Sequence, residues 1–189
     1  MNRSLSIQEQ KALLRNKLRQ KLEGLKLEER KERSENILAK LFSHSKFKKS
    51  EHLLIYISCG FEVQTRSLVE EALSRDKKIY VPRIDPEEKK ILMIETSDLN
   101  ELKPGSYGVM EPPLDQARVG DPQDLDLAIV PGLGFDREGG RLGRGKGYFD
   151  RFLKEARNAY KIGLAFECQI VDQIPRNEND VLLDEVLIG

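Results

Sequence analysis

The sequence predicts an α/β fold: a three-layer, Rossmann-like sheet that is largely parallel, has helices on both faces and carries an N-terminal helical hairpin. Short apolar runs typical of buried strands alternate along the chain with amphipathic segments at helical spacing. A chain of 189 residues is long enough for one core and short for two, so we expect residues 1–189 to form a single domain.

The first two elements are expected to be charged helices over residues 7–23 and 27–42, separated by Gly24. Apolar residues recur in each at the spacing of a helix. They are Leu14, Leu18 and Leu22 in the first helix and Ile37, Leu38 and Leu41 in the second. The pair is predicted to form the helical hairpin.

The middle of the chain is predicted to form three strands and one helix. The run HLLIYIS, residues 52–58, is a short apolar run of the kind that a buried strand shows. Residues 65–76 have helical spacing, with Ser67 and Glu70 placed for a capping box. The runs KIYVPRI (78–84) and ILMIE (91–95) follow as strands that the turn DPEE can join.

The last part of the chain is predicted to complete the sheet and to form its ligand-binding edge. After a Pro- and Gly-rich stretch, we expect a strand in DLDLAIVPG, a glycine-rich segment, a helix over residues 148–157, a strand over 160–166 and an edge strand over 184–189. Ligands of such sheets bind beyond the carboxyl ends of the strands. The strand ends in YISCGFE and AIVPGLGF should both open onto that edge.

The glycine-rich segment is predicted to bind an anion, and phosphate is the anion favoured. Seven of the 14 glycines lie between Gly132 and Gly147, directly after a strand and directly before a helix. Backbone N–H groups without a Cβ in the way, backed by a helix N-terminus, form a cradle for phosphate. Arg141, Arg144 and Lys146 add full positive charges. The alternative is a flexible surface loop.

The same segment comes close to a Walker A motif without completing it. Gly140, Gly145 and Lys146 satisfy the GxxxxGK pattern, but Gly147 stands where Ser or Thr holds magnesium in a standard P-loop. We therefore reject a standard P-loop and expect a carboxylate to bind any metal. Asp150, on the first turn of the next helix, is the candidate, and its alternative role is to complement the helix dipole.

Two cations of the first helix are predicted to face its buried side. Lys11 and Arg15 are four residues apart and share the side of the leucines. Like charges at this spacing repel, and an anion between them would turn that cost into a gain. In the alternative, the long stems cover apolar surface and the charged ends reach water. The second cationic cluster in the glycine-rich segment favours the anion.

Composition excludes several classes of partner. Lys and Arg number 32 and Asp and Glu also number 32, so no global field attracts nucleic acid or an anionic membrane. The start MNRSLSIQEQ has no apolar segment, and no apolar run approaches the roughly 20 residues of a membrane span. Two distant cysteines, Cys59 and Cys168, fit a reducing compartment, so we expect a cytoplasmic protein. His44 and His52 lack the spacing of a zinc site.

The segment VPGLGFDREGGRLGRGKGYFDRFL closely resembles the signature of the 5-formyltetrahydrofolate cyclo-ligase family. KALLR, YVPRI, LAFECQ and IPRNENDVLLDEVL occur in that family's order and spacing, so the resemblance covers essentially the whole chain. It implies conversion of 5-formyltetrahydrofolate and ATP, with Mg²⁺, into 5,10-methenyltetrahydrofolate, ADP and phosphate. The expected partners are therefore small molecules, without nucleic acid or membrane, and we expect a monomer.

The resemblance also implies roles for individual residues. Those implied to bind the nucleotide are Lys11, Arg15, Arg141, Leu142, Gly143, Arg144, Gly145, Lys146, Gly147, Tyr148 and Phe149. Those implied to contact the folate are Ile57, Glu62, Tyr107, Arg144, Gly145, Lys146, Gly147 and Tyr148. Arg144 and Lys146 are expected to be catalytic, because they lie where phosphoryl transfer occurs. Asp150 and Asp180 are expected to bind Mg²⁺.

Two other functions stay open. Another enzyme that handles ATP or a sugar phosphate would use the same loop without folate, and Glu62 would then be a solvated loop residue. The Arg, Gly and aromatic residues of RLGRGKGYF are also typical of segments that bind single-stranded nucleic acid. Against this second function, aromatic residues make up only 6% of the chain and its net charge is +0.

Overall fold

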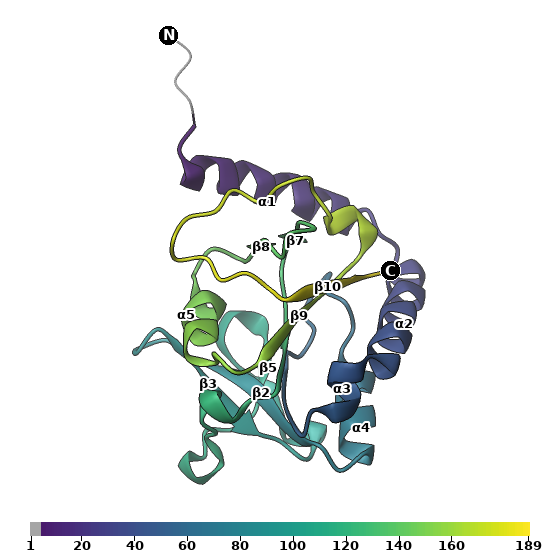
Figure 1. Ribbon diagram of the computed structural model, residues 1–189, viewed down its shortest axis with the longest axis vertical. Coiled ribbons are helices and arrows are strands. Elements are labelled where there is room, and N and C mark those ends of the chain that lie inside the picture. The colour runs from purple at the N-terminus through teal and green to yellow at the C-terminus, as the bar shows by residue number, and fades with distance from the viewer. Residues whose placement is uncertain (1–4) are drawn as a thin grey trace.

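The computed structural model describes residues 5–189 and contains a six-stranded sheet between two groups of helices (Figure 1). The sheet order is β10–β9–β6–β1–β2–β3, and all neighbours are parallel except β2 and β3. The strands are β1 (His52–Ile55), β2 (Lys78–Asp85), β3 (Lys90–Glu95), β6 (Leu127–Val130), β9 (Tyr160–Ala165) and β10 (Glu185–Ile188). The predicted α/β class with a largely parallel sheet is confirmed. Residues 1–4 lie outside the described residues. They belong to the N-terminal stretch in which the sequence analysis expected no leader segment.

Helices and two small ribbons complete the described part of the chain. The helices are α1 (Ile7–Glu23), α2 (Leu27–Ser43), α3 (Ser45–Lys49), α4 (Arg66–Ser74) and α5 (Tyr148–Glu155). The antiparallel ribbons are β4 (Lys103–Pro104) with β5 (Met110–Glu111), and β7 (Gly134–Phe135) with β8 (Arg141–Leu142). Short 3₁₀ turns are η1 (Leu99–Glu101), η2 (Ser106–Gly108), η3 (Gln116–Arg118), η4 (Pro122–Asp124) and η5 (Glu167–Gln169). No helix within residues 5–189 has both the length and the apolar character that crossing a membrane requires.

Alternate residues of the strands pack into two cores, one on each face of the sheet. Leu53 and Ile55 of β1 belong to the core that α2, α3 and α4 cover. Leu54, between them, belongs to the core on the other face, where Phe152 and Leu153 of α5 pack. Because successive strand residues point to opposite faces, each central strand is buried on both sides, as its apolar sequence predicts. The predicted helices on both faces are therefore present.

The two N-terminal helices have the predicted bounds to within a residue, but they diverge. In Figure 1, α1 lies across one end of the sheet and α2 runs down its side, so the chain turns a corner at Gly24. Helix α1 packs on η5, and its Leu18 contacts Leu142 and Ile174. Helix α2 packs on β10 and α3 instead. The helical pattern predicts each element, but the direction of each helix depends on contacts made far along the chain.

Helix α4 corrects one prediction of the sequence analysis. A capping box at Ser67 and Glu70 was expected, but the helix begins at Arg66 and its N-cap residue is Thr65. Glu70 pairs with Arg66, one turn away, at 3.1 Å. Thr65 makes no capping hydrogen bond, because its hydroxyl donates to the carbonyl oxygen of Tyr56 in the preceding loop. Tertiary contacts therefore set the start of this helix.

The expected strand pairings at both edges are present. Strand β3 runs antiparallel to β2, and the DPEE turn between them is fixed by Asp85, whose carboxylate accepts the N–H groups of Glu87 and Glu88. Strand β10 forms the other edge, next to β9. The expected strand bounds differ by one residue at several ends and by three residues in the first strand, because β1 ends at Ile55 and the chain then leaves the sheet as a loop.

Candidate active site

A cavity of about 580 Å³ lies at the carboxyl edge of the central strands. Residues Tyr56 and Ile57 enter it just after β1, and Pro131 and Gly132 just after β6. Every residue that the sequence analysis assigned to nucleotide, folate or metal lines this cavity. They are Lys11, Arg15, Ile57, Glu62, Tyr107, Arg141, Leu142, Gly143, Arg144, Gly145, Lys146, Gly147, Tyr148, Phe149, Asp150 and Asp180. Residues from both ends of the chain thus meet at the predicted edge.

The glycine-rich segment is an ordered structure anchored by a buried aspartate. The Asp136 carboxylate accepts the N–H groups of Glu138, Gly140 and Ile174 at 2.7–3.0 Å. A Cβ on Gly140 would lie 2.2 Å from the Asp136 carboxylate, so only glycine fits there. This turn joins β7 to β8 and delivers Arg141 to the cavity. The alternative of a flexible surface loop therefore does not describe this part of the segment.

The end of the segment requires glycine for a second reason. Gly145 and Gly147 have φ angles of +104° and +68°, a region that side chains with a Cβ rarely adopt. Gly147 is the N-cap residue of α5, and the first turn of this helix, where N–H groups have no partner within the helix, lines the cavity. The predicted combination of a glycine-rich loop with a helix N-terminus is present.

Arg141 is a buried cation with unused donor capacity. Its Nη2 lies 2.9 Å from Asp150 and its Nη1 donates to the carbonyl oxygen of Pro131. The Nε atom is buried and has no partner among the described residues. Because a buried donor without a partner is costly, a ligand oxygen at this position would be favoured.

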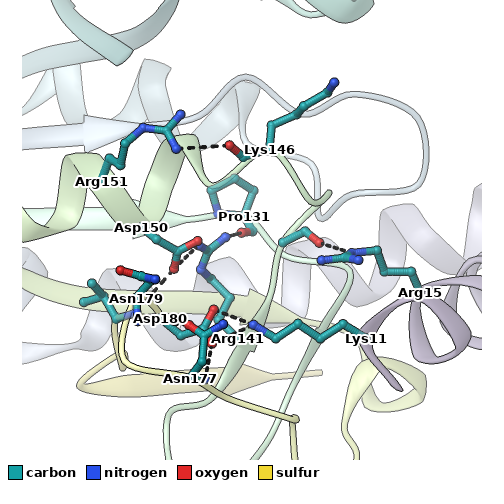
Figure 2. A network of polar contacts seen from close by, with 12 residues as sticks. Lys11, Arg15, Pro131, Arg141, Lys146, Asp150, Arg151, Asn177, Asn179 and Asp180 are labelled. Carbon is teal, nitrogen blue, oxygen red and sulfur yellow. Dashed lines mark hydrogen bonds and ion pairs between the residues drawn. The ribbon is translucent and has the colours of Figure 1, made fainter. Parts of the chain in front are cut away.

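The cations of α1 reach the same place, as Figure 2 shows. The Lys11 ammonium lies 2.6 Å from both carboxylate oxygens of Asp180, and the Arg15 Nε donates to the carbonyl oxygen of Gly143. Burial lowers the pKa of Arg15, with Asp180 opposing the shift. The Lys11 side chain is only 6% exposed, so its charged end does not reach water as the alternative predicted. It stays inside the protein, on the cavity wall.

A further part of the cavity, called its Glu62 end below, holds an ion pair between two segments that are distant in the sequence. Glu62 Oε1 accepts a hydrogen bond from Arg144 Nη2 at 2.8 Å, and Glu62 Oε2 accepts the N–H of Cys59 at 2.9 Å. Burial raises the pKa of Glu62, and the nearby Arg144 opposes that shift. Glu62 is therefore a mostly buried carboxylate, which contradicts the alternative of a solvated loop residue.

Two tyrosines face each other beside this pair. Tyr107, between β4 and β5, has a φ of +58°, and its hydroxyl lies 3.5 Å from that of Tyr148 at the start of α5. The ring centroids are 6.3 Å apart. The apolar residues Pro82, Ile84, Ile91 and Val109 line the cavity as well. This end therefore offers flat aromatic and apolar surface together with one buried carboxylate.

The two predicted metal ligands, Asp150 and Asp180, lie on the same cavity wall and are each paired with a cation (Figure 2). Residues 5–189 contain no cluster of three or more His, Cys, Asp or Glu side chains suited to a metal. Mg²⁺ in phosphate-binding sites commonly uses one or two carboxylates, waters and the phosphates themselves. Two carboxylates beside a phosphate cradle therefore fit Mg²⁺ that arrives with a polyphosphate.

The sequence analysis missed two supporting residues. Asp136 fixes the glycine-rich turn, and an Asp shortly before a Gly–Gly pair is a turn signal that could have indicated it. Gln169, almost fully buried, donates to the carbonyl oxygens of Gly132 and Leu133 and accepts the N–H of Phe166. Nothing in the local sequence marks Gln169 as a support of the site, because the two carbonyl oxygens to which it donates lie 36 and 37 residues away.

The fold and the site together define a class of protein. A three-layer α/β structure with a ligand cavity at the carboxyl edge of its strands, a glycine-rich loop and buried cations is typical of enzymes that bind phosphorylated ligands. A model of the 5-formyltetrahydrofolate cyclo-ligase family matches residues 7–189. The chain therefore belongs to this family, and it is a ligase.

Individual relatives agree with this assignment. The mouse 5-formyltetrahydrofolate cyclo-ligase is 32% identical over 200 residues, which cover 97% of this chain and 96% of the relative. The NMR structure of Aquifex aeolicus 5,10-methenyltetrahydrofolate synthetase has a TM-score of 0.82 at 35% identity, covering 94% of this chain and 89% of the other. A 5,10-methenyltetrahydrofolate synthetase from Mycoplasma pneumoniae, 24% identical with a TM-score of 0.75 and covering 94% and 97% of the two chains, supports the fold.

Proposed function

We propose that the protein uses ATP and Mg²⁺ to convert 5-formyltetrahydrofolate into 5,10-methenyltetrahydrofolate, releasing ADP and phosphate. The observation that carries the proposal is one cavity lined by two chemically different groups of residues. The cradle of residues 141–147, with Lys11 and Arg15, suits a polyphosphate. The end with Glu62 and the two facing tyrosines suits a flat ring system that carries N–H donors.

The polyphosphate end acts through charge and backbone donors. Lys11 and Arg15 on one side and Lys146 on the other supply positive charge, and the N-terminus of α5 adds N–H groups. The buried Nε of Arg141 supplies a donor that no described residue uses. Preorganised groups of this kind stabilise charge that develops during phosphoryl transfer without having to reorganise.

The folate end acts through shape and one carboxylate. A buried carboxylate recognises an N–H edge strongly, because leaving its oxygens without donors is costly. Glu62 can accept such donors from a pterin ring, and Tyr107 and Ile57 offer surface on which that ring can pack. Phe149, also on the cavity wall, has no hydroxyl group and is assigned to packing against the nucleotide.

The reaction needs activation of a poor leaving group. The formyl oxygen attacks the γ-phosphorus of ATP, a new P–O bond forms, and the bond to the bridging oxygen breaks to release ADP. N10 of the folate then attacks the activated carbon and loses its proton, and the C–O bond breaks with release of phosphate. Arg144, which contacts Glu62 from the glycine-rich loop, and Lys146 lie where the two substrates meet and are assigned to stabilising the transferred group.

Asp150 and Asp180 are assigned to Mg²⁺, which would neutralise charge on the phosphate oxygens when bound. In the described structure both carboxylates are paired with Arg141 and Lys11. Phosphate oxygens are alternative partners for these two cations, so a bound polyphosphate would make the carboxylates available.

We also infer that the protein acts as a cytoplasmic monomer on small molecules. Light scattering tests the monomeric state, and a heavier species whose fraction increases with protein concentration would contradict it.

The direct test is absorbance in the band of the methenyl product. The protein is mixed with 5-formyltetrahydrofolate, ATP and Mg²⁺, and controls omit each in turn. An increase that requires all three supports the substrates and the metal together. A flat trace from folded protein that still binds ATP would contradict the folate role and leave the phosphate cradle, as expected for a different ATP-dependent enzyme.

A further inference from the structure

The loop that presents Glu62 is held together by its own hydrogen bonds. It spans residues 56–65, between β1 and α4. The carbonyl oxygen of Tyr56 accepts from Thr65 Oγ1 at 2.5 Å, and the N–H of Ser58 donates to the same Oγ1 at 3.1 Å. The N–H of Thr65 donates back to Ser58 Oγ at 3.4 Å. Thr65 therefore closes the loop by joining its two ends.

A second contact crosses the middle of the loop. The Tyr56 hydroxyl donates to the carbonyl oxygen of Val63 at 3.1 Å, and the residue before Val63 is Glu62. Tyr56 is almost fully buried and lines the cavity, so its hydroxyl fixes the backbone directly behind the Glu62 carboxylate. With Cys59 N–H on Glu62 Oε2, the carboxylate has a fixed position at the cavity wall.

The use of Thr65 is unusual for its position. Threonine at a helix N-cap ordinarily bonds to an N–H of the first turn. Here Thr65 is the N-cap residue of α4 and is completely buried, yet it makes no capping bond and directs its hydroxyl to the loop. A stabilising contact of the helix is therefore given up in favour of the geometry of residues 56–65. Both hydrogen bonds of the Thr65 hydroxyl lie within the loop that carries Glu62.

We propose that Thr65 is a positioning residue for the folate substrate, and that with Tyr56 it holds the Glu62 carboxylate toward the cavity. This inference rests on the proposed function, because it assigns Glu62 to the folate. It gives the two substrates largely separate supports, since the polyphosphate cradle is held by Asp136 and by α1 and meets this loop at Arg144, which pairs with Glu62.

The test compares KM for 5-formyltetrahydrofolate with KM for ATP in five variants. Thr65→Val keeps the shape of the side chain and removes the hydroxyl, whereas Thr65→Ser keeps the hydroxyl. Thr65→Val should raise the folate KM by about tenfold, the size expected for loss of a well-placed hydrogen bond to a binding group, and raise the ATP KM much less, because Arg144 is the one contact named here between the loop and the cradle. Thr65→Ser should restore most of the folate KM. Tyr56→Phe should act in the same direction as Thr65→Val.

Thr96→Val is the matched control. Thr96 is as buried as Thr65, and its hydroxyl donates to the carbonyl oxygen of Ile94 at 3.0 Å, away from the cavity wall. This variant removes a buried threonine hydroxyl from the same protein, so it should lower the melting temperature without moving either KM. A folate-specific effect confined to Thr65 and Tyr56 is one that general destabilisation cannot produce.

The outcomes distinguish this inference from the proposed function. If Glu62→Gln leaves the folate KM unchanged, the folate role of Glu62 is wrong. If Glu62→Gln raises the folate KM but Thr65→Val and Tyr56→Phe do not, the positioning role alone is wrong. Equal increases of both KM values, or a loss of kcat alone, would also overturn it. Should Thr65→Val fail to fold, Tyr56→Phe, which deletes a single oxygen atom, decides the question.

Discussion

Replacing Lys11 by methionine removes a charge and keeps an unbranched apolar stem, which isolates the effect of its ion pair. The side chains of Lys11 and Asp180 are 6% and 16% exposed, and the ammonium lies 2.6 Å from both carboxylate oxygens. In the Lys11→Met variant, the Asp180 carboxylate keeps only the N–H of Asn177, at 2.7 Å. A largely buried negative charge then loses its direct ion pair and keeps the more distant charge of Arg15.

The size of the effect follows from this burial. Exposed ion pairs contribute about 0–1 kcal/mol, whereas removing one partner of a fully buried pair costs about 3–5 kcal/mol. Asp180 keeps one hydrogen bond and some access to water, so we expect a loss of about 2 kcal/mol. For a chain of this length, that loss lowers the melting temperature by about 4–8 °C. Differential scanning calorimetry measures it, with Lys17→Met, an exposed lysine of the same helix, as the control.

A second substitution separates stability from binding. Asp180→Asn in the Lys11→Met background removes the unpaired charge, so most of the lost stability should return. The ATP KM should stay raised by at least about tenfold, because the cation assigned to the phosphates is still missing. An unchanged melting temperature in Lys11→Met would refute the reasoning about burial. An unchanged ATP KM in a folded Lys11→Met protein would refute the phosphate role.

Three further substitutions test the support, the pH dependence and the metal. Asp136→Asn replaces one of two oxygens that accept backbone N–H groups, so urea denaturation should show a loss of about 2 kcal/mol, and unchanged stability would contradict the anchoring role. Burial raises the pKa of Glu62 above its ordinary value of 4.5, so the folded chain binds this proton more tightly than the unfolded chain does. The folded state therefore loses stability as the pH rises from 4.5 through the raised pKa, where Glu62 ionises. The difference in melting temperature between Glu62→Gln and wild type should therefore become more positive from acid to neutral pH, and a constant difference would contradict it. Asp150→Asn should require more Mg²⁺ for half-maximal turnover, whereas an identical Mg²⁺ titration would place the metal elsewhere.

Much of the fold follows from periodic patterns that act locally. The bounds of α1, the pairing of β2 with β3 and the edge position of β10 all agree with expectations from short apolar runs and turn residues. The direction of α1 does not, because it depends on Leu18 meeting Leu142 and Ile174 more than a hundred residues away. Local periodicity specifies an element, and long-range packing specifies where the element lies.

The candidate site shows the same division. Glycines and cations within residues 132–147 indicate a cradle, because their chemistry is visible in one short stretch. The Glu62–Arg144 pair joins residues 82 positions apart, and no spacing rule indicates it. Thr65 illustrates the limit further, because its sequence context predicts a helix cap near it and its hydroxyl serves the loop instead.

The balanced composition of the chain conceals a strongly uneven distribution of charge. The cavity wall carries seven cations, Lys11, Arg15, Arg141, Arg144, Lys146, Arg151 and Lys154, against the four carboxylates Glu62, Glu111, Asp150 and Asp180. The formal excess of three positive charges stands in a chain whose net charge is +0, so the rest of the chain balances it with a net negative charge. A cavity with low-dielectric walls concentrates such a field on its contents. A small polyanion that fits the cavity therefore meets strong attraction there, as the proposed binding of a nucleotide requires.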